Sequence, residues 1–242
     1  VVDNKGPAKM EKITVRFIPE SFTRVSEIET GSVDIIYNVP PENLAKLENN
    51  DDLTLYKYLQ SGIDYISINT KAEHLNNVKV REAMALAINK AELNSILNNT
   101  VQLRYGFISP AQLCYDKATE DKLEQEYGYN LDKAKALLAQ AGYKDENGDG
   151  ILEKDGKPLA ISLMVALDSS YFKQVAPMIQ AQLQQVGINL ELKEYESTYI
   201  KQMMYDHKYE MATRGNSWPD PDILYYTFHT EGGLPWSSPE TD

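Results

Sequence analysis

The sequence predicts an α/β fold, and three observations support this. Short segments rich in β-branched residues alternate with segments whose apolar residues recur at helical spacing. The composition is globular, with 42% hydrophobic and 25% charged residues. The length of 242 residues allows one large domain or two small ones with a substantial core.

Strands and helices alternate from the start of the chain. Apolar residues spaced three apart predict a helix from Phe22 to Ile28 that ends at Gly31. Pro41 suits the first position of a second helix. Strands are expected at four places: Ile13–Ile18, Val33–Val39, Leu53–Leu59 and Asp64–Thr70. The strands before residue 60 have too little flanking structure to cover both faces of a sheet, so this segment looks like part of something larger.

The rest of the chain is more helical. Helices are expected at about Val78–Asn98, after a cap at Asn130, through Phe172–Val186 and over Tyr199–Asp206. Pro177 would either kink the third of these helices or begin it. Strands are expected at 158–167, Ile188–Tyr195 and Tyr209–Thr213, and the segment from Gly215 onward is expected to be an ordered loop.

Charge and hydropathy exclude several classes of protein. Lys and Arg number 24 against 36 Asp and Glu, a formal net charge of −12, and no basic patch suggests nucleic-acid binding or an anionic membrane surface. No apolar run approaches the roughly 20 residues that cross a bilayer, so no transmembrane segment is expected. The first residues also lack the pattern of a signal peptide. The single cysteine, Cys114, excludes an internal disulfide and a cysteine-cluster metal site.

Catalytic patterns are missing from the sequence. The three histidines, His74, His207 and His229, form no HExxH arrangement, and there is no GxSxG elbow or Gly-rich phosphate loop. Cys114 has no histidine near it in sequence and is interpreted as a buried or incidental thiol rather than a nucleophile. We therefore expect a protein that is not an enzyme.

Six blocks of sequence carry a family resemblance. They are ITVRFIPESFTRVSEIETGSVDII, YISINT, NNVKVREAMALAINKAEL, LDKAKALLAQAGYKDENGDGILEKDGKPLAISLM, IQAQLQQVGINLEL and RGNSWPDPDILYY. In this order and spacing the chain resembles the extracytoplasmic solute-binding proteins of oligopeptide and dipeptide ABC importers (solute-binding protein family 5). The resemblance implies a fragment of a type II periplasmic-binding-protein fold, with a mixed sheet flanked by helices. Residues 1–62 would be a remnant of the first lobe, and residues 63–242 the second lobe, incomplete at its C-terminal end. The N-terminal half and the signal segment of such a protein would be absent.

The resemblance also implies a function and a location. Members capture extracellular peptides between two lobes and deliver them to a membrane permease, so the partners expected are a peptide and ABC-transporter permease subunits. The parent protein would be extracytoplasmic, either periplasmic or a cell-surface lipoprotein. The same scaffold also binds nickel chelates, haem or oligosaccharides, and a peptide-pheromone receptor in signalling is a further alternative.

The segment Arg214–Asp222 is the strongest candidate for ligand binding. Pro219 and Pro221 stiffen it, so that Trp218 offers a broad apolar face and Asp220 a carboxylate for an α-ammonium group. The resemblance implies that Asp220 holds the peptide N-terminus, and an alignment shifted by one turn would assign this to Asp222. Alternatively the loop is a packing motif in which Asp222 caps a helix beginning near Ile223. Arg214 is a candidate carboxylate partner, and the candidates of this segment are Arg214, Asn216, Ser217, Trp218 and Asp220.

Two further candidates lie on the expected strand DYISINT. Tyr65 and Asn69 belong to the segment that in the family crosses from one lobe to the other, so either could face a ligand. Ordinary strand packing is the alternative, with Asn69 bonding the backbone at a turn.

The segment Asp145–Glu153 predicts a turn that could hold calcium. Asp145, Asn147 and Asp149 alternate before Gly150, as oxygen ligands do in an EF-hand loop, and Glu153 would supply a further carboxylate. The twelfth position is Gly156 rather than a bidentate Glu, and Asn-Gly and Asp-Gly are also simple turn chemistry. Any calcium there is expected to be structural and remote from the ligand; no other cofactor is expected.

Overall fold

The computed structural model describes residues 9–229 and 231–232. These fall into two compact units, the first ending at Leu55 and the second beginning at Tyr56. The end of the expected second lobe, residues 233–242, lies outside the described residues.

The first unit contains two helices. Helix α1 (Ser21–Glu29) buries Val25, and helix α2 (Pro41–Glu48) starts on Pro41 and buries Leu47, so both helices are confirmed. The strands predicted at 13–18, 33–39 and 53–59 are wrong: within residues 9–59 the structure has no strand. The apolar residues of the first of them are largely exposed, at 72% for Ile13, 89% for Val15 and 94% for Phe17. Their β-branched sequence is not sufficient, because a strand forms only against a neighbour that accepts its backbone hydrogen bonds.

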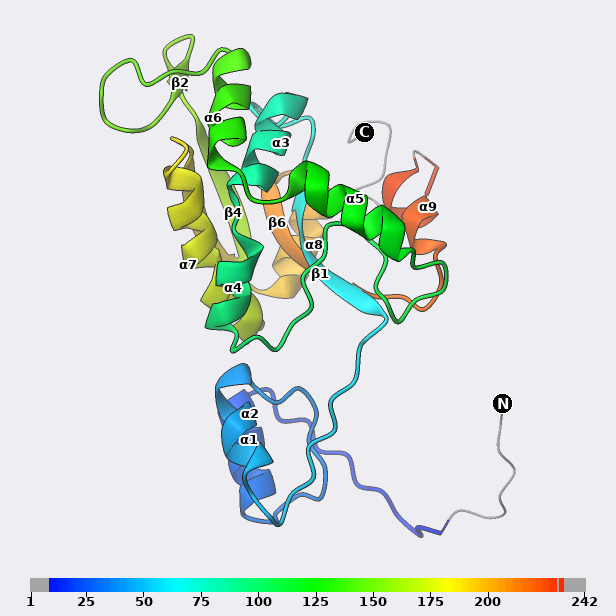
Figure 1. Ribbon diagram of the computed structural model, residues 1–242. Coiled ribbons are helices and arrows are strands. Elements are labelled where there is room, and N and C mark those ends of the chain that lie inside the picture. The colour runs from blue at the N-terminus through cyan, green and yellow to red at the C-terminus, as the bar shows by residue number, and fades with distance from the viewer. Residues whose placement is uncertain (1–8, 230, 233–242) are drawn as a thin grey trace. The chain divides into compact units, whose positions relative to one another are not determined.

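The second unit is built on a four-stranded mixed sheet (Figure 1), which confirms the predicted fold class. The strands are β1 (Gly62–Ile68), β4 (Ala160–Ala166), β5 (Asn189–Tyr195) and β6 (Met211–Ser217), in the order β1-β6-β4-β5. Strand β4 is parallel to β5 and to β6, whereas β1 is antiparallel to β6. A short hairpin of β2 (Glu153–Lys154) and β3 (Lys157–Pro158) stands apart from this sheet.

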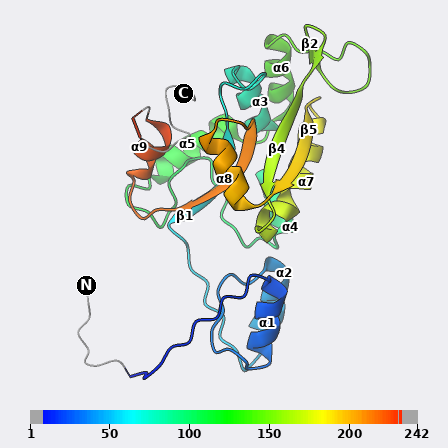
Figure 2. The same ribbon diagram turned by 180° about the vertical axis from the view of Figure 1, so that it is seen from behind.

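Helices cover both faces of this sheet because side chains of a strand alternate between them. On β4, Ile161, Leu163 and Val165 enter the larger core with helices α3 (Val78–Ala87), α6 (Leu131–Gln140) and α7 (Ser170–Gln184). Met164 and Ala166 point the other way, into a smaller core with helix α8 (Ser197–Tyr205). The turned view in Figure 2 brings α8 to the front of the sheet. The remaining helices are α4 (Lys90–Ile96), α5 (Lys117–Tyr127) and α9 (Ile223–Phe228).

Several boundaries differ from the sequence prediction. The single helix expected over Val78–Asn98 is two helices, because Ile88 is extended and the Asn89 side chain caps α4 by accepting a hydrogen bond from the Glu92 N–H. Helix α7 starts at Ser170 and runs through Pro177, so the proline does not begin it. The cap at Asn130 is confirmed: its side-chain oxygen accepts from the Lys133 N–H at 2.9 Å.

No helix among the described residues is long and apolar enough to span a membrane.

Candidate ligand-binding site

The parallel strands end together at one edge of the sheet. Strands β4, β5 and β6 all point to this edge, and β1 begins there, since Gly62 pairs with Ser217. We call it the carboxyl edge. Helices α7 and α8 also begin there, directly after β4 and β5. In open α/β sheets ligands bind outside the carboxyl ends of the strands, so the topology alone marks this edge as the place for a site.

Strand β6 extends into the segment predicted to be a loop. It was expected to end at Thr213 but continues to Ser217, so Arg214, Asn216 and Ser217 are strand residues. The reason is non-local: β1 offers a complete antiparallel partner, with Tyr65 opposite Arg214 and Gly62 opposite Ser217. Only Trp218 and the residues that follow it leave the sheet.

Trp218 is held by its backbone and exposes its ring. Its N–H donates to the Ser61 carbonyl at 3.0 Å, and its carbonyl accepts from the Gln112 side-chain amide. The residue is 40% exposed, and its ring lies 5.6 Å from that of Tyr226 on α9. A fixed backbone with an open aromatic face suits the predicted role as a wall for a ligand.

Asp220 lies on the surface two residues beyond Trp218. One carboxylate oxygen accepts from the Asp222 N–H at 3.0 Å, and the side chain is otherwise exposed. Helix α9 begins at Ile223 with Asp222 at its N-cap position, as the packing alternative predicted, but the Asp222 side chain makes no capping hydrogen bond. Asp220 therefore stabilises this turn, and its exposed carboxylate can still accept further hydrogen bonds.

Tyr65, Arg214 and Asn216 come together on one face of the sheet. Strand alternation and the pairing register place their side chains on the same face as that of Ala212, which packs in the smaller core with α8. Burial raises the pKa of the Tyr65 hydroxyl, and the nearby Arg214 charge only partly opposes this rise. This face therefore places a phenol, a guanidinium and an amide side by side.

The Ser217 side chain lies on the opposite face of the sheet and is separated from this group. It lines an open concavity of about 430 Å³ at the carboxyl edge. The other residues of this concavity are Tyr58, Leu59, Gln60, Ser61 and Ala111.

Asn69 lies at the other end of β1, away from the carboxyl edge. It is buried, its side-chain amide donates to the Tyr209 carbonyl at 2.9 Å, and its side-chain oxygen accepts from the Lys71 N–H at 3.0 Å. These bonds match the alternative in which Asn69 secures a turn, and the structure does not bring it together with the other candidates.

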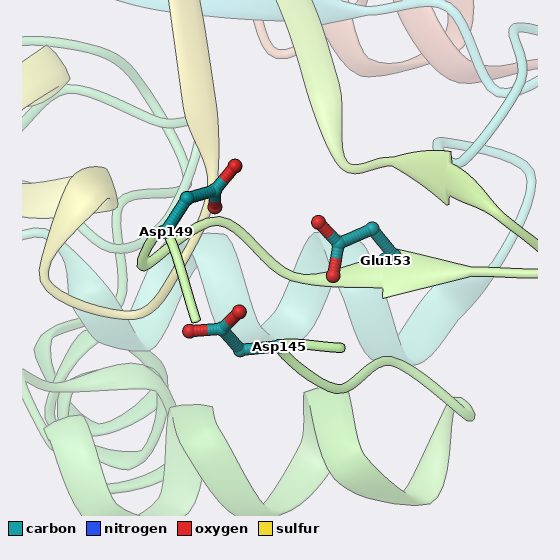
Figure 3. A group of neighbouring side chains, drawn as sticks. All are labelled: Asp145, Asp149 and Glu153. Carbon is teal, nitrogen blue, oxygen red and sulfur yellow. The ribbon is translucent and has the colours of Figure 1, made fainter. Parts of the chain in front are cut away.

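The Asp145–Glu153 loop gathers three carboxylates (Figure 3). Ligand oxygens of Asp145, Asp149 and Glu153 lie within 4.8 Å of one another, and Glu153 is buried while the two aspartates are exposed. The Asn147 amide bridges Asp149 and Glu153, donating to each at 3.0 Å. Asp145 also accepts from the N–H groups of Gly148 and Gly150 at 2.7 and 3.0 Å. The loop is therefore a hydrogen-bonded turn, and its carboxylate oxygens are also of the kind that bind a hard cation.

Three residues near the carboxyl edge are not predicted from the sequence. The Phe107 ring lies edge-on 4.9 Å from that of Tyr65 and also 4.9 Å from that of Phe228. Ser109 and Gln112 are buried polar residues that bond to the backbone of Gln60 and Trp218. All three lie on the irregular segment between α4 and α5, where no periodicity in the sequence signals them.

The fold defines a class: it is a mixed sheet flanked by helices, and its structural neighbours are type II periplasmic binding proteins. Residues 3–235 match the profile described as "Bacterial extracellular solute-binding proteins, family 5 Middle". The chain belongs to this family, as the resemblance predicted. The family consists of solute-binding proteins, not enzymes.

Three relatives show how similar the chain is to known proteins in sequence and in structure. The oligopeptide-binding protein AppA of Bacillus subtilis (strain 168) is 27% identical over 236 residues, covering 95% of this chain and 43% of that protein. Its structure in complex with a nonapeptide superposes with a TM-score of 0.78 at 28% identity, over 90% of this chain and 43% of that one. The nickel-binding periplasmic protein of Escherichia coli (strain K12) is 31% identical over 202 residues, covering 80% of this chain and 37% of that protein. DppA of Helicobacter pylori in complex with the peptide STSA matches with a TM-score of 0.77 at 26% identity, over 97% of this chain and 44% of that one. The chain spans less than half the length of these relatives.

Proposed function

We propose that this chain is part of the substrate-binding component of an ABC importer, which captures extracellular peptides and delivers them to a membrane permease. In this proposal residues 63–242 form most of the ligand-closing lobe, and residues 1–62 are a remnant of the first lobe. The parent protein is extracytoplasmic, periplasmic or a cell-surface lipoprotein, and catalyses no reaction.

One observation carries the proposal: the carboxyl edge presents Trp218 from a fixed backbone, with the exposed Asp220 carboxylate beside it. Little entropy is lost when a ligand meets a surface that is already ordered. The match to AppA, whose structure holds a nonapeptide, supports a peptide as the occupant.

Each candidate residue has a role in this mechanism. The Asp220 carboxylate accepts charge-assisted hydrogen bonds from the peptide α-ammonium group, and the Trp218 ring packs against a side chain or the main chain. Arg214 pairs with a ligand carboxylate, with Tyr65 and Asn216 beside it on the same face of the sheet. Ser217 offers a hydroxyl in the open concavity. The direct role predicted for Asn69 has the least support, since both ends of its side chain already bond the backbone.

The test is native mass spectrometry of the full-length parent, purified without refolding. A ladder of peptide masses supports the proposal and gives the preferred length. A single discrete non-peptide mass would overturn it.

A second candidate is a non-peptide ligand on the same scaffold, such as a nickel chelate, haem or an oligosaccharide. The 31% identity to a nickel-binding relative favours the chelate among these. Arg214 suits an anionic chelate as well as a peptide carboxylate. A receptor that presents a peptide pheromone is separated from the transport proposal by deleting the permease, because only a receptor would still signal.

We also propose that the Asp145–Glu153 loop holds a structural calcium ion. Its support is the set of three carboxylates within 4.8 Å, one of them buried. An ion there offsets the mutual repulsion of these groups, and it lies on the loop before β2 rather than at the carboxyl edge.

A further inference from the structure

Two buried polar residues link three segments at the carboxyl edge. Ser109 is 4% exposed and Gln112 is 6% exposed, and both lie on the segment between α4 and α5. A buried polar side chain is costly unless it is fully hydrogen-bonded, so the partners of these two residues show what they do.

Gln112 uses both ends of its side-chain amide. Its oxygen accepts from the Ser109 N–H at 2.6 Å, and its nitrogen donates to the Trp218 carbonyl. The Ser109 hydroxyl in turn donates to the Gln60 carbonyl at 2.8 Å and accepts from the Ala111 N–H at 3.3 Å. With the bond from the Trp218 N–H to the Ser61 carbonyl, these contacts close a ring around the point where the chain leaves β6.

The segment that carries this pair is itself anchored. The buried Glu120 carboxylate on α5 accepts from the N–H groups of Tyr105 and Gly106 at 2.6 and 3.1 Å. Between this anchor and Ser109, the Phe107 ring packs on Tyr65. Gln112 therefore reaches Trp218 from a support that is fixed at two points, not from a free loop.

We propose that Gln112 is a positioning residue for ligand binding: it fixes the backbone of Trp218 so that the exposed indole ring is already oriented when a ligand arrives. The proposal rests on the proposed function, because it takes Trp218 as a wall of the ligand site. It assigns no ligand contact to Gln112 itself, which is buried beneath the Trp218 backbone.

The test is Gln112→Glu, which keeps the shape and the acceptor for the Ser109 N–H but replaces the donor to Trp218 with a second oxygen. The matched control is Gln182→Glu. Gln182 is also a buried glutamine, accepting from the Asn89 N–H at 3.1 Å and donating to the Glu92 carboxylate at 2.8 Å, but it links α7 to α4. Both variants are made in the full-length parent with Trp236→Phe, so that Trp218 is the only tryptophan of this chain. Any tryptophan outside these 242 residues is replaced by Phe in every protein compared.

Two readouts are measured: affinity for a mixed di- to hexapeptide library, and the fluorescence anisotropy of Trp218 without ligand. We expect Gln112→Glu to weaken peptide affinity roughly tenfold and to lower the anisotropy of Trp218, because a buried carbonyl is left unpaired beside a carboxylate. Gln182→Glu is expected to lower the unfolding temperature while leaving both readouts unchanged.

Unchanged anisotropy in Gln112→Glu, or equal losses in both variants, would overturn the positioning role. Should Gln112→Glu fail to fold, Gln112→Asn, one methylene shorter, gives the same two readouts. If the unsubstituted parent binds no peptide in the library, the proposed function fails, and the anisotropy of Trp218 still decides whether Gln112 positions it.

Discussion

The first pair of the β1–β6 ladder leaves no room for a side chain at Gly62, and we expect Gly62→Ala to destabilise the second unit by about 2 kcal/mol. A Cβ atom added to Gly62 would lie 2.0 Å from the Asn216 carbonyl oxygen and 2.9 Å from the Ser217 Cα. Both are backbone atoms, so no rotamer change relieves the overlap. Relief requires β1 and β6 to separate by about 1 Å at the carboxyl edge, which breaks the terminal hydrogen bonds of the ladder, each worth about 0.5–1.5 kcal/mol.

The assay is equilibrium unfolding in urea and in a thermal scan, with Gly106→Ala as the control. A Cβ atom at Gly106 would meet only side-chain atoms, at 3.0 Å from Glu120 and 3.3 Å from Leu123, and no backbone atom. For a unit of this size, about 2 kcal/mol lowers the unfolding temperature by about 4–8 °C, and the control should lose clearly less. An equal loss in the two variants would refute the reasoning, because the clash with backbone would then not set the stability.

Three further predictions concern charge. Calcium at about 1 mM should raise the unfolding temperature of the chain. If this concentration is 100 times the dissociation constant, the stabilisation is about 2.7 kcal/mol, and Asp149→Asn should remove most of it. An unfolding temperature that is the same in calcium and in chelator would show that the loop is a turn without an ion. Asp220→Asn should weaken binding of a peptide with a free N-terminus about tenfold in the full-length parent and leave an N-terminally blocked peptide unchanged, as measured by calorimetry, and equal losses would count against an amine-holding carboxylate. Burial lowers the pKa of Lys90 to about 8 in the folded protein. The buried charge of Lys90 therefore destabilises the fold fully below pH 8, and this destabilisation is relieved as the pH rises toward the pKa of Lys90 in the unfolded chain. The unfolding free energy should therefore rise between pH 8 and 9.5, and rise less in Lys90→Met; parallel pH profiles of the two proteins would contradict this.

The parts of the fold that sequence predicts are those whose signals are local. The alternation in Ile188–Tyr195 and the apolar run around Leu163 identify β5 and β4 because each strand buries its own residues against helices nearby in sequence. The cap at Asn130 is likewise a contact over three residues. Such signals are complete within a short window.

The parts that sequence does not predict depend on distant partners. The residues of Ile13–Ile18 have strand composition, yet no neighbouring strand pairs with them in the described chain. Strand β6 continues to Ser217 only because β1, about 150 residues earlier, supplies its register. Gln112 reaches Trp218 across 106 residues of sequence, and no short motif contains both.

That same register couples the candidate site to the core. Tyr65 lies opposite Arg214 on one face, while Ile66 and Ile68 pack against the larger core on the other. Slipping β1 by one residue would exchange the two faces, burying the Tyr65 hydroxyl among apolar side chains and placing Ile66 beside the Arg214 charge. The apolar residues of β1 therefore hold Tyr65 toward Arg214 by the free energy of their own burial. Substitutions at Ile66 should consequently alter ligand affinity as well as stability, although Ile66 faces away from the site.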